Sequence, residues 1–89
     1  MHKATNRFWA NYGDLDSGTK RIADRNFEIL KSDPTHPSLK FKKVGQLWSA
    51  RVGLNHRALA VQADHGFTWV WIGTHSEYDK ILSQPRIMQ

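Results

Sequence analysis

Apolar and polar residues alternate in the middle of the chain over residues 47–52, and an apolar run follows Arg57 over residues 58–61. A two-residue period is typical of strands whose two faces lie in different surroundings. The intervening residues 53–56 include Gly and Asn, which tolerate the positive φ angles of tight turns. The pattern therefore predicts an antiparallel hairpin at the centre of the fold.

Apolar residues at helical spacing predict two helices ahead of this hairpin. The first follows a capping residue, Thr5 or Asn6, and places four side chains on one face: Phe8, Trp9, Tyr12 and Leu15. The second begins at Asp16 or Ser17 and ends near Lys31, with an apolar stripe formed by Ala23, Phe27 and Leu30. We expect the first helix to bury its tryptophan against the sheet.

Two further strands are predicted over residues 39–44 and 67–72, and a third helix follows them. Thr74 and Glu77 have the spacing of a capping box, in which each side chain accepts a hydrogen bond from the backbone N–H of the other residue. The third helix is therefore predicted over residues 75–83.

The element order α-α-β-β-β-β-α predicts an α+β fold, with a single domain over residues 1–89. An N-terminal helical hairpin packs on one face of a four-stranded antiparallel sheet, with a short C-terminal helix. The first four residues are expected to be unstructured, and Gly73 is expected to end the last strand. Within that strand, the two-residue period places Trp69 and Trp71 on one face. The predicted core includes Phe27, Leu30, Trp48, Ala50, Val52, Val70 and Ile72.

A net charge of +5 and a pI of about 9.9 favour acidic partners. Nucleic acid, an anionic surface and an acidic protein segment all suit a small basic domain, although the same charge also serves solubility alone. The chain has no cysteine, which excludes disulfides and thiolate metal sites. No apolar run reaches the roughly 18 residues that span a bilayer, and the N-terminus lacks a signal sequence, so we expect a cytoplasmic protein without membrane contact.

Basic residues on three successive strands are the first candidates for binding a phosphate: Lys40, Lys42, Lys43, Arg51 and Arg57. Arginine suits this role because its planar group donates two parallel hydrogen bonds and keeps its charge. His56 is a further candidate for nucleic-acid binding, since it precedes Arg57 in the turn. Whether Arg51 and Arg57 share a face depends on the pairing register, which the pattern leaves open. Scattered surface charge is the alternative interpretation.

His75 and Tyr78 are spaced three residues apart at the start of the third predicted helix, so they share a helix face. Histidine can act as a general acid or base near neutral pH, and the tyrosine can position a phosphate or stack on a base. The alternative is a surface histidine beside a core tyrosine. The histidines and carboxylates show no ligand spacing, so we expect neither a metal nor another cofactor.

Four segments, in order, resemble the RelE/ParE superfamily of bacterial type II toxins, and most of all its short RelE-like proteins: H-P-S-L-x-F-K (36–42), L-W-S-A-R-V-G (47–53), H-R-A-L (56–59) and W-I-G-T-H-S-E-Y-D-K (71–80). The resemblance implies a RelE-like fold, an antitoxin that wraps around the toxin, and metal-independent cleavage of translated mRNA on the ribosome. Operator DNA would be bound only through the antitoxin complex.

The resemblance also implies roles for single residues. Arg51 and Arg57 match the family's sheet arginines, which hold the phosphate and stabilise the transition state, and His75 and Tyr78 match its C-terminal pair. RelE carries lysines on the strand where this chain has Leu47 and Ser49, and no hairpin glutamate stands in for them as it does in YoeB-like members.

Two alternatives to the nuclease therefore stay open. ParE members of the superfamily inhibit DNA gyrase and cut no RNA, and an inactive homologue would act only as a binding module. The N-terminal strand that is customary in the superfamily is also not evident in residues 1–5.

Overall fold

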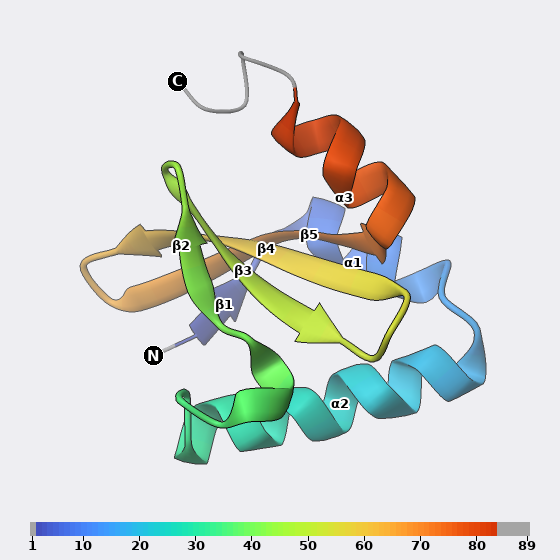
Figure 1. Ribbon diagram of the computed structural model, residues 1–89, viewed down its shortest axis with the longest axis horizontal. Helices are drawn as coiled ribbons and strands as arrows, with labels where there is room; N and C mark the ends of the chain where they lie inside the picture. The colour runs from blue at the N-terminus through green and yellow to red at the C-terminus, as the bar shows by residue number, and fades with distance from the viewer. Residues whose placement is uncertain (1, 84–89) are drawn as a thin grey trace.

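The computed structural model describes residues 2–83 and places one mixed sheet between helices (Figure 1). The sheet has five strands in the order β1-β5-β4-β3-β2. The elements are β1 (His2–Ala4), α1 (Asn6–Gly13), α2 (Ser17–Ser32), the short 3-10 helix η1 (Pro37–Leu39), β2 (Lys42–Val44), β3 (Leu47–Val52), β4 (His56–Ala63), β5 (Gly66–Thr74) and α3 (His75–Leu82). Strands β2 to β5 pair antiparallel in succession, which confirms the predicted meander.

Strand β1 corrects the expectation of an unstructured N-terminus and a four-stranded sheet. It pairs parallel to β5, with His2 opposite Phe67. The His2 ring stacks on the Phe67 ring at a centroid distance of 5.8 Å, and the indole N–H of Trp69 donates to Nδ1 of His2 over 3.1 Å. Three residues are too few for a periodic pattern, so only these contacts with a distant strand reveal the element.

The predicted helix starts are confirmed by their caps. The Thr5 hydroxyl accepts the N–H of Phe8 at the start of α1, and the Asp16 carboxylate accepts the N–H of Thr19 at the start of α2. These hydrogen bonds satisfy N–H groups that lack a partner within the helix. Each start is therefore determined by residues close together in the sequence.

The helices cover both faces of the sheet, whereas the sequence predicted one covered face. Side chains of α1 and α2 pack on the core that contains Ala50, Val52 and Ala58. Helix α3 instead packs on a second cluster, which consists of Leu47, Leu59, Trp71 and Tyr78. Figure 1 shows α2 and α3 on opposite sides of the sheet. Alternating residues of β3 and β4 supply the two clusters, so both faces find apolar cover.

A β-bulge in β5 overturns the prediction that Trp69 and Trp71 share a face. Ala60 pairs with Trp69, whereas the preceding Leu59 pairs with Trp71, so Val70 is the extra residue. An extra residue reverses the alternation of side chains beyond it. Trp69 consequently lies in the core under α1 and α2, and Trp71 lies in the cluster under α3.

The predicted core is confirmed for four of its seven members, since Leu30, Ala50, Val52 and Ile72 are buried. Trp48 and Val70 are partly buried. Phe27 and Trp9 were expected inside but are 38% and 56% exposed. Helical spacing shows that residues share a face but not how far that face extends beyond the sheet.

The predicted strand over residues 39–44 is shorter in the structure. Leu39 is buried but belongs to η1, and Lys40 adopts the left-handed conformation with φ of 44°. An isolated left-handed residue interrupts an extended chain, so β2 begins only at Lys42.

Strand β5 continues through Gly73, where the sequence predicted its end. The ring of Trp71 lies across Gly73, and a side-chain carbon at Gly73 would overlap that ring. We expect Gly73→Ala to lower the free energy of unfolding by about 1–3 kcal/mol, because a packed ring would have to move. Urea denaturation measures the change. Gly13→Ala is the matched control, because a carbon added at Gly13, the last residue of α1, has no packing neighbour within 4 Å. An equal change in the free energy of unfolding for both variants would contradict the packing of Trp71 on Gly73.

The His2 imidazole links the stability of β1 to pH. Burial lowers the pKa of His2 below 6.5, and the nearby Lys31 ammonium adds to the effect. The folded state therefore favours neutral His2, so its contribution is present above pH 6.5 and is lost as the pH falls below 6.5 towards the folded-state pKa. We expect the stability difference between the parent and His2→Asn to shrink between pH 7 and pH 5, measured by denaturation at each pH. A constant difference would contradict this linkage.

Candidate functional site

Arg51 and Arg57 lie directly opposite each other on β3 and β4. Directly opposed residues of an antiparallel pair project from the same face, so the register starts both arginine side chains from one face of the sheet. Ser49 and Leu59 are the next opposed pair along this face, and Leu59 belongs to the cluster under α3. The two arginines therefore stand on the face that carries α3.

Two like charges in opposed positions destabilise a sheet unless an anion lies between or near them. Among residues 2–83 neither arginine forms an ion pair with a carboxylate. The Nη1 group of Arg57 donates to its own neighbour, the His56 carbonyl, over 2.8 Å, and Nε of Arg51 is buried without a protein acceptor among these residues. The pair thus carries two positive charges that no carboxylate within residues 2–83 compensates, which is the charge that an anion site needs.

The predicted lysines are divided between the faces. Lys42 is opposite Ser49, so it joins the two arginines, whereas Lys43 is opposite Trp48 and projects from the other face. Lys40 precedes the strand in its left-handed conformation. We call Lys42, Arg51 and Arg57 the arginine face; the structure does not bring the other two lysines to it.

The start of α3 is attached to the turn between β3 and β4. The backbone N–H of His75 donates to the Asn55 carbonyl over 2.7 Å. The predicted capping box is confirmed, since Thr74 Oγ1 accepts the N–H of Glu77 and Glu77 Oε1 accepts the N–H of Thr74. The hydrogen bonds from Thr74 lower the pKa of Glu77. The turn that separates the two arginines therefore also holds His75 in place.

His75 and Tyr78 share a helix face as predicted, with ring centroids 5.9 Å apart. Tyr78 is buried in the cluster under α3, while the side chain of His75 is 46% exposed. Nδ1 of His75 lies 3.2 Å from Oδ2 of Asp79. Asp79 was not among the predicted site residues, although its i, i+4 spacing from His75 was a signal for the contact.

His56 does not join the arginine face. It is opposite Val52 and Thr74, and it lines a second cavity whose other polar residues include Asp16 and Glu77. The charge of His56 contributes to the lowered pKa of both carboxyl groups, after the hydrogen bonds of their own caps. Consecutive strand residues project from opposite faces, which separates His56 from Arg57.

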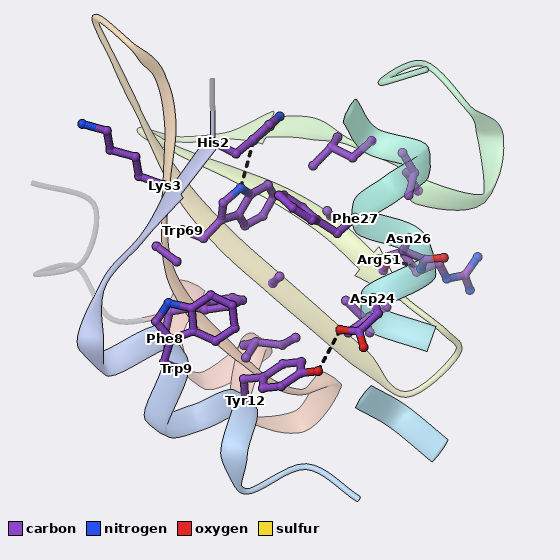
Figure 2. A pocket seen from close by; sticks show the side chains of 18 residues that line it. His2, Lys3, Phe8, Trp9, Tyr12, Asp24, Asn26, Phe27, Arg51 and Trp69 are labelled. Atoms are coloured by element: carbon purple, nitrogen blue, oxygen red, sulfur yellow. Dashed lines mark hydrogen bonds between the residues drawn. The ribbon is translucent and has the colours of Figure 1, made fainter. Parts of the chain in front are cut away.

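A separate hollow, which we call the helix groove, lies between α1, α2 and the face of the sheet opposite the arginine face (Figure 2). Its volume is about 280 Å³. Its floor includes Ala50 and Ala58, whose small side chains leave the space unfilled. Figure 2 shows Trp9 and Phe27 on opposite sides of the groove. Large exposed apolar side chains around a hollow are typical of interaction sites.

Positive charge surrounds the helix groove. Lys3 lines it, the Lys20 ammonium lies 5.7 Å from the Tyr12 ring centroid, and the Lys31 ammonium lies 5.0 Å from the Phe27 ring centroid. The Tyr12 hydroxyl donates to Asp24 over 2.7 Å. The groove therefore combines an apolar interior with a mainly cationic rim.

No protein-family model matches the sequence, and no curated protein matches it. Solved structures do resemble it. YafQ from E. coli strain BL21(DE3) has a TM-score of 0.71 at 12% identity, over 88% of this chain and 96% of YafQ. A chain of the RelB-RelE antitoxin-toxin complex from Methanococcus jannaschii has a TM-score of 0.65 at 19% identity, over 88% of this protein and 96% of that chain. The isolated E. coli RelE toxin has a TM-score of 0.62 at 12% identity, over 90% and 95%.

These structural similarities show that the chain has a RelE-like fold. They confirm the resemblance that the sequence motifs indicated. The N-terminal strand that was not evident in the sequence is present as β1. No helix within residues 2–83 is long and apolar enough to cross a membrane. The same residues contain no group of three or more potential metal ligands.

Proposed function

We propose that this protein is the toxin of a type II toxin-antitoxin system and cleaves translated mRNA as an endoribonuclease. The opposed, uncompensated pair of Arg51 and Arg57 carries the proposal. A phosphodiester gains negative charge as it reaches a pentacoordinate transition state, and fixed guanidinium groups stabilise that charge more than the ground state. The RelE-like fold supports the proposal because named toxins share it.

The reaction is an attack of the ribose 2′-oxygen on the adjacent phosphorus. The new O2′–P bond forms, the P–O5′ bond breaks, and the products are a 2′,3′-cyclic phosphate and a free 5′-hydroxyl. One proton leaves the 2′-hydroxyl and one reaches the 5′-oxygen. His75 transfers one of these protons at its imidazole, the other is exchanged with water, and Tyr78 supports the ring of His75.

Leu47 and Ser49 favour a second function. They are buried on the arginine face side of β3, where RelE carries lysines, so two basic groups of that enzyme have no counterpart. A RelE-like protein without them would bind rather than cut, as a ParE-like inhibitor of DNA gyrase or as an inactive homologue. The arginine face would then contact the bound target without turnover.

Inducing the protein in bacteria separates these functions in one culture. We expect mRNA to be cut within translated regions, which primer extension maps, while plasmid supercoiling stays unchanged. Relaxed or broken plasmid with intact transcripts would instead establish gyrase inhibition. Normal growth with intact transcripts and unchanged plasmid would contradict both the nuclease and the gyrase inhibitor.

The helix groove suits the proposed antitoxin. We propose that it receives one bulky apolar side chain from an amphipathic helix with acidic flanks, because its interior is apolar and its rim is mainly cationic. RelB-RelE complexes among the similar structures support an antitoxin partner. Ribosome and mRNA are the further partners that cleavage requires.

Replacing the exposed tryptophan at the groove should weaken antitoxin binding. Tryptophan is the residue type most often central to an interface, and its loss commonly costs about 2 kcal/mol or more, which is roughly 30-fold in Kd. We expect Trp9→Ser to show this loss in calorimetry with the protein encoded beside this gene. Leu54→Ser is the matched control, since Leu54 is 77% exposed in the β3–β4 turn, outside the groove. If both variants bind the antitoxin with equal affinity, the antitoxin does not bind in the helix groove.

A further inference from the structure

We infer that Asp79 is a positioning residue for His75, an assignment that rests on the RNA cleavage proposed above. Nδ1 of His75 lies 3.2 Å from Oδ2 of Asp79, one helical turn later in α3. The Glu77 carboxylate is already occupied, because it accepts from the backbone N–H and the hydroxyl of Thr74 at 3.1 and 2.9 Å. Within residues 2–83, Asp79 is thus the carboxylate in contact with the imidazole.

This contact selects one tautomer of the imidazole. The lone pairs of an ionised carboxylate 3.2 Å away repel an unprotonated Nδ1, so the neutral ring carries its proton on Nδ1 and presents an unprotonated Nε2. Nε2 takes the proton of the 2′-hydroxyl as the O2′–P bond forms, and the carboxylate stabilises the resulting imidazolium. The 5′-oxygen takes its proton from water as the P–O5′ bond breaks, and the imidazolium afterwards returns its own proton to water.

Two further contacts hold the ring in place. The backbone N–H of His75 is held by the Asn55 carbonyl, and Tyr78 packs near the ring at 5.9 Å. The backbone, one ring face and one ring nitrogen of His75 are therefore restrained from three directions. The remaining polar atom of the imidazole is Nε2, which is the atom that proton transfer requires.

Helix stability does not account for the pair. A helix favours acidic side chains in its first turn and basic ones in its last turn, as Glu77 and Lys80 illustrate in α3. His75 and Asp79 have the reverse order, which is the weaker orientation for an i, i+4 ion pair. Aspartate is also a poor helix former within a helix. A requirement on His75 explains an aspartate here better than a requirement of the helix.

The test compares Asp79→Asn, Asp79→Glu and a matched control in the full chain. We expect His75→Gln to slow RNA cleavage about 100-fold and Asp79→Asn about tenfold, since Asp79 supports only part of the proton transfer. Asp79→Glu should restore most of the rate. Glu28→Gln should leave it unchanged, because Glu28 forms a similarly exposed pair with Lys31 at 2.9 Å in α2. In the His75→Gln background, Asp79→Asn should add nothing.

Nitrogen-15 NMR of labelled histidine provides a readout that needs no substrate. We expect His75 in the parent to be the Nδ1–H tautomer and Asp79→Asn to shift it towards a mixture. The same tautomer ratio in both proteins overturns the assignment, as does an equal loss of cleavage from Asp79→Asn with and without His75. A parent that cuts no RNA overturns the proposed function, while the NMR comparison still supports or overturns the His75–Asp79 contact.

Discussion

Replacing Arg57 by alanine is expected to reduce RNA cleavage by about 100- to 1000-fold, equivalent to roughly 3–4 kcal/mol of transition-state stabilisation. Arg57 is opposite Arg51 across the hairpin, and in the proposed reaction the two side chains together provide the positive charge for a developing phosphorane. Arg57→Lys should restore only part of the rate, because an ammonium cannot form the two parallel hydrogen bonds of arginine. Growth arrest on induction and primer-extension mapping of cleaved mRNA in the induced cells measure the effect.

The same substitution should leave the fold intact or stabilise it slightly. Removing one of two opposed like charges relieves repulsion in the sheet, so the Tm of Arg57→Ala is expected to equal or exceed that of the parent. Loss of function with a gain of stability is the pattern of a residue kept for activity. Arg25→Ala is the matched control, because it removes the same charge from an exposed position on α2. Undiminished toxicity of a folded Arg57→Ala variant would show that Arg57 is only a surface cation.

Leu59→Ala is expected to lower the free energy of unfolding by about 2–5 kcal/mol. Leu59 is 1% exposed and lies in the cluster with Leu47, Trp71 and Tyr78, so truncation leaves a cavity beneath α3. A domain of this size has a stability of about 5–10 kcal/mol, so the loss is a large share of the total and should lower the Tm by roughly 10 °C or more. Thermal melting followed by near-ultraviolet circular dichroism measures the loss.

Val61→Ala is the control for this cavity. Val61 lies two residues further along β4, on the same face, but it is 41% exposed. Its truncation removes little buried surface, and we expect less than about 1 kcal/mol. Equal destabilisation by the two variants would contradict a closed cluster under α3, and with it the support that Tyr78 gives to His75.

Local features of the fold were predictable from the sequence. The caps at Thr5 and Asp16, the capping box at Thr74 and the central hairpin all depend on residues within a few positions of one another, so their physical causes can be read along the chain. The types of the candidate site residues were also evident, because arginine and histidine carry their chemistry wherever the fold places them. Asp79 was detectable through its spacing from His75 but was not identified.

Only the tertiary structure decided how these parts meet. The pairing of β1 with β5, the position of α3 on the opposite face and the bulge at Val70 depend on residues far apart in sequence. The register that opposes Arg51 and Arg57 has the same origin, and a shift of one residue would separate them. The sequence by itself determined the local elements and the chemistry available to this protein. Its long-range packing decided which side chains share a face, because that choice minimises exposed apolar surface over the whole chain rather than within any segment.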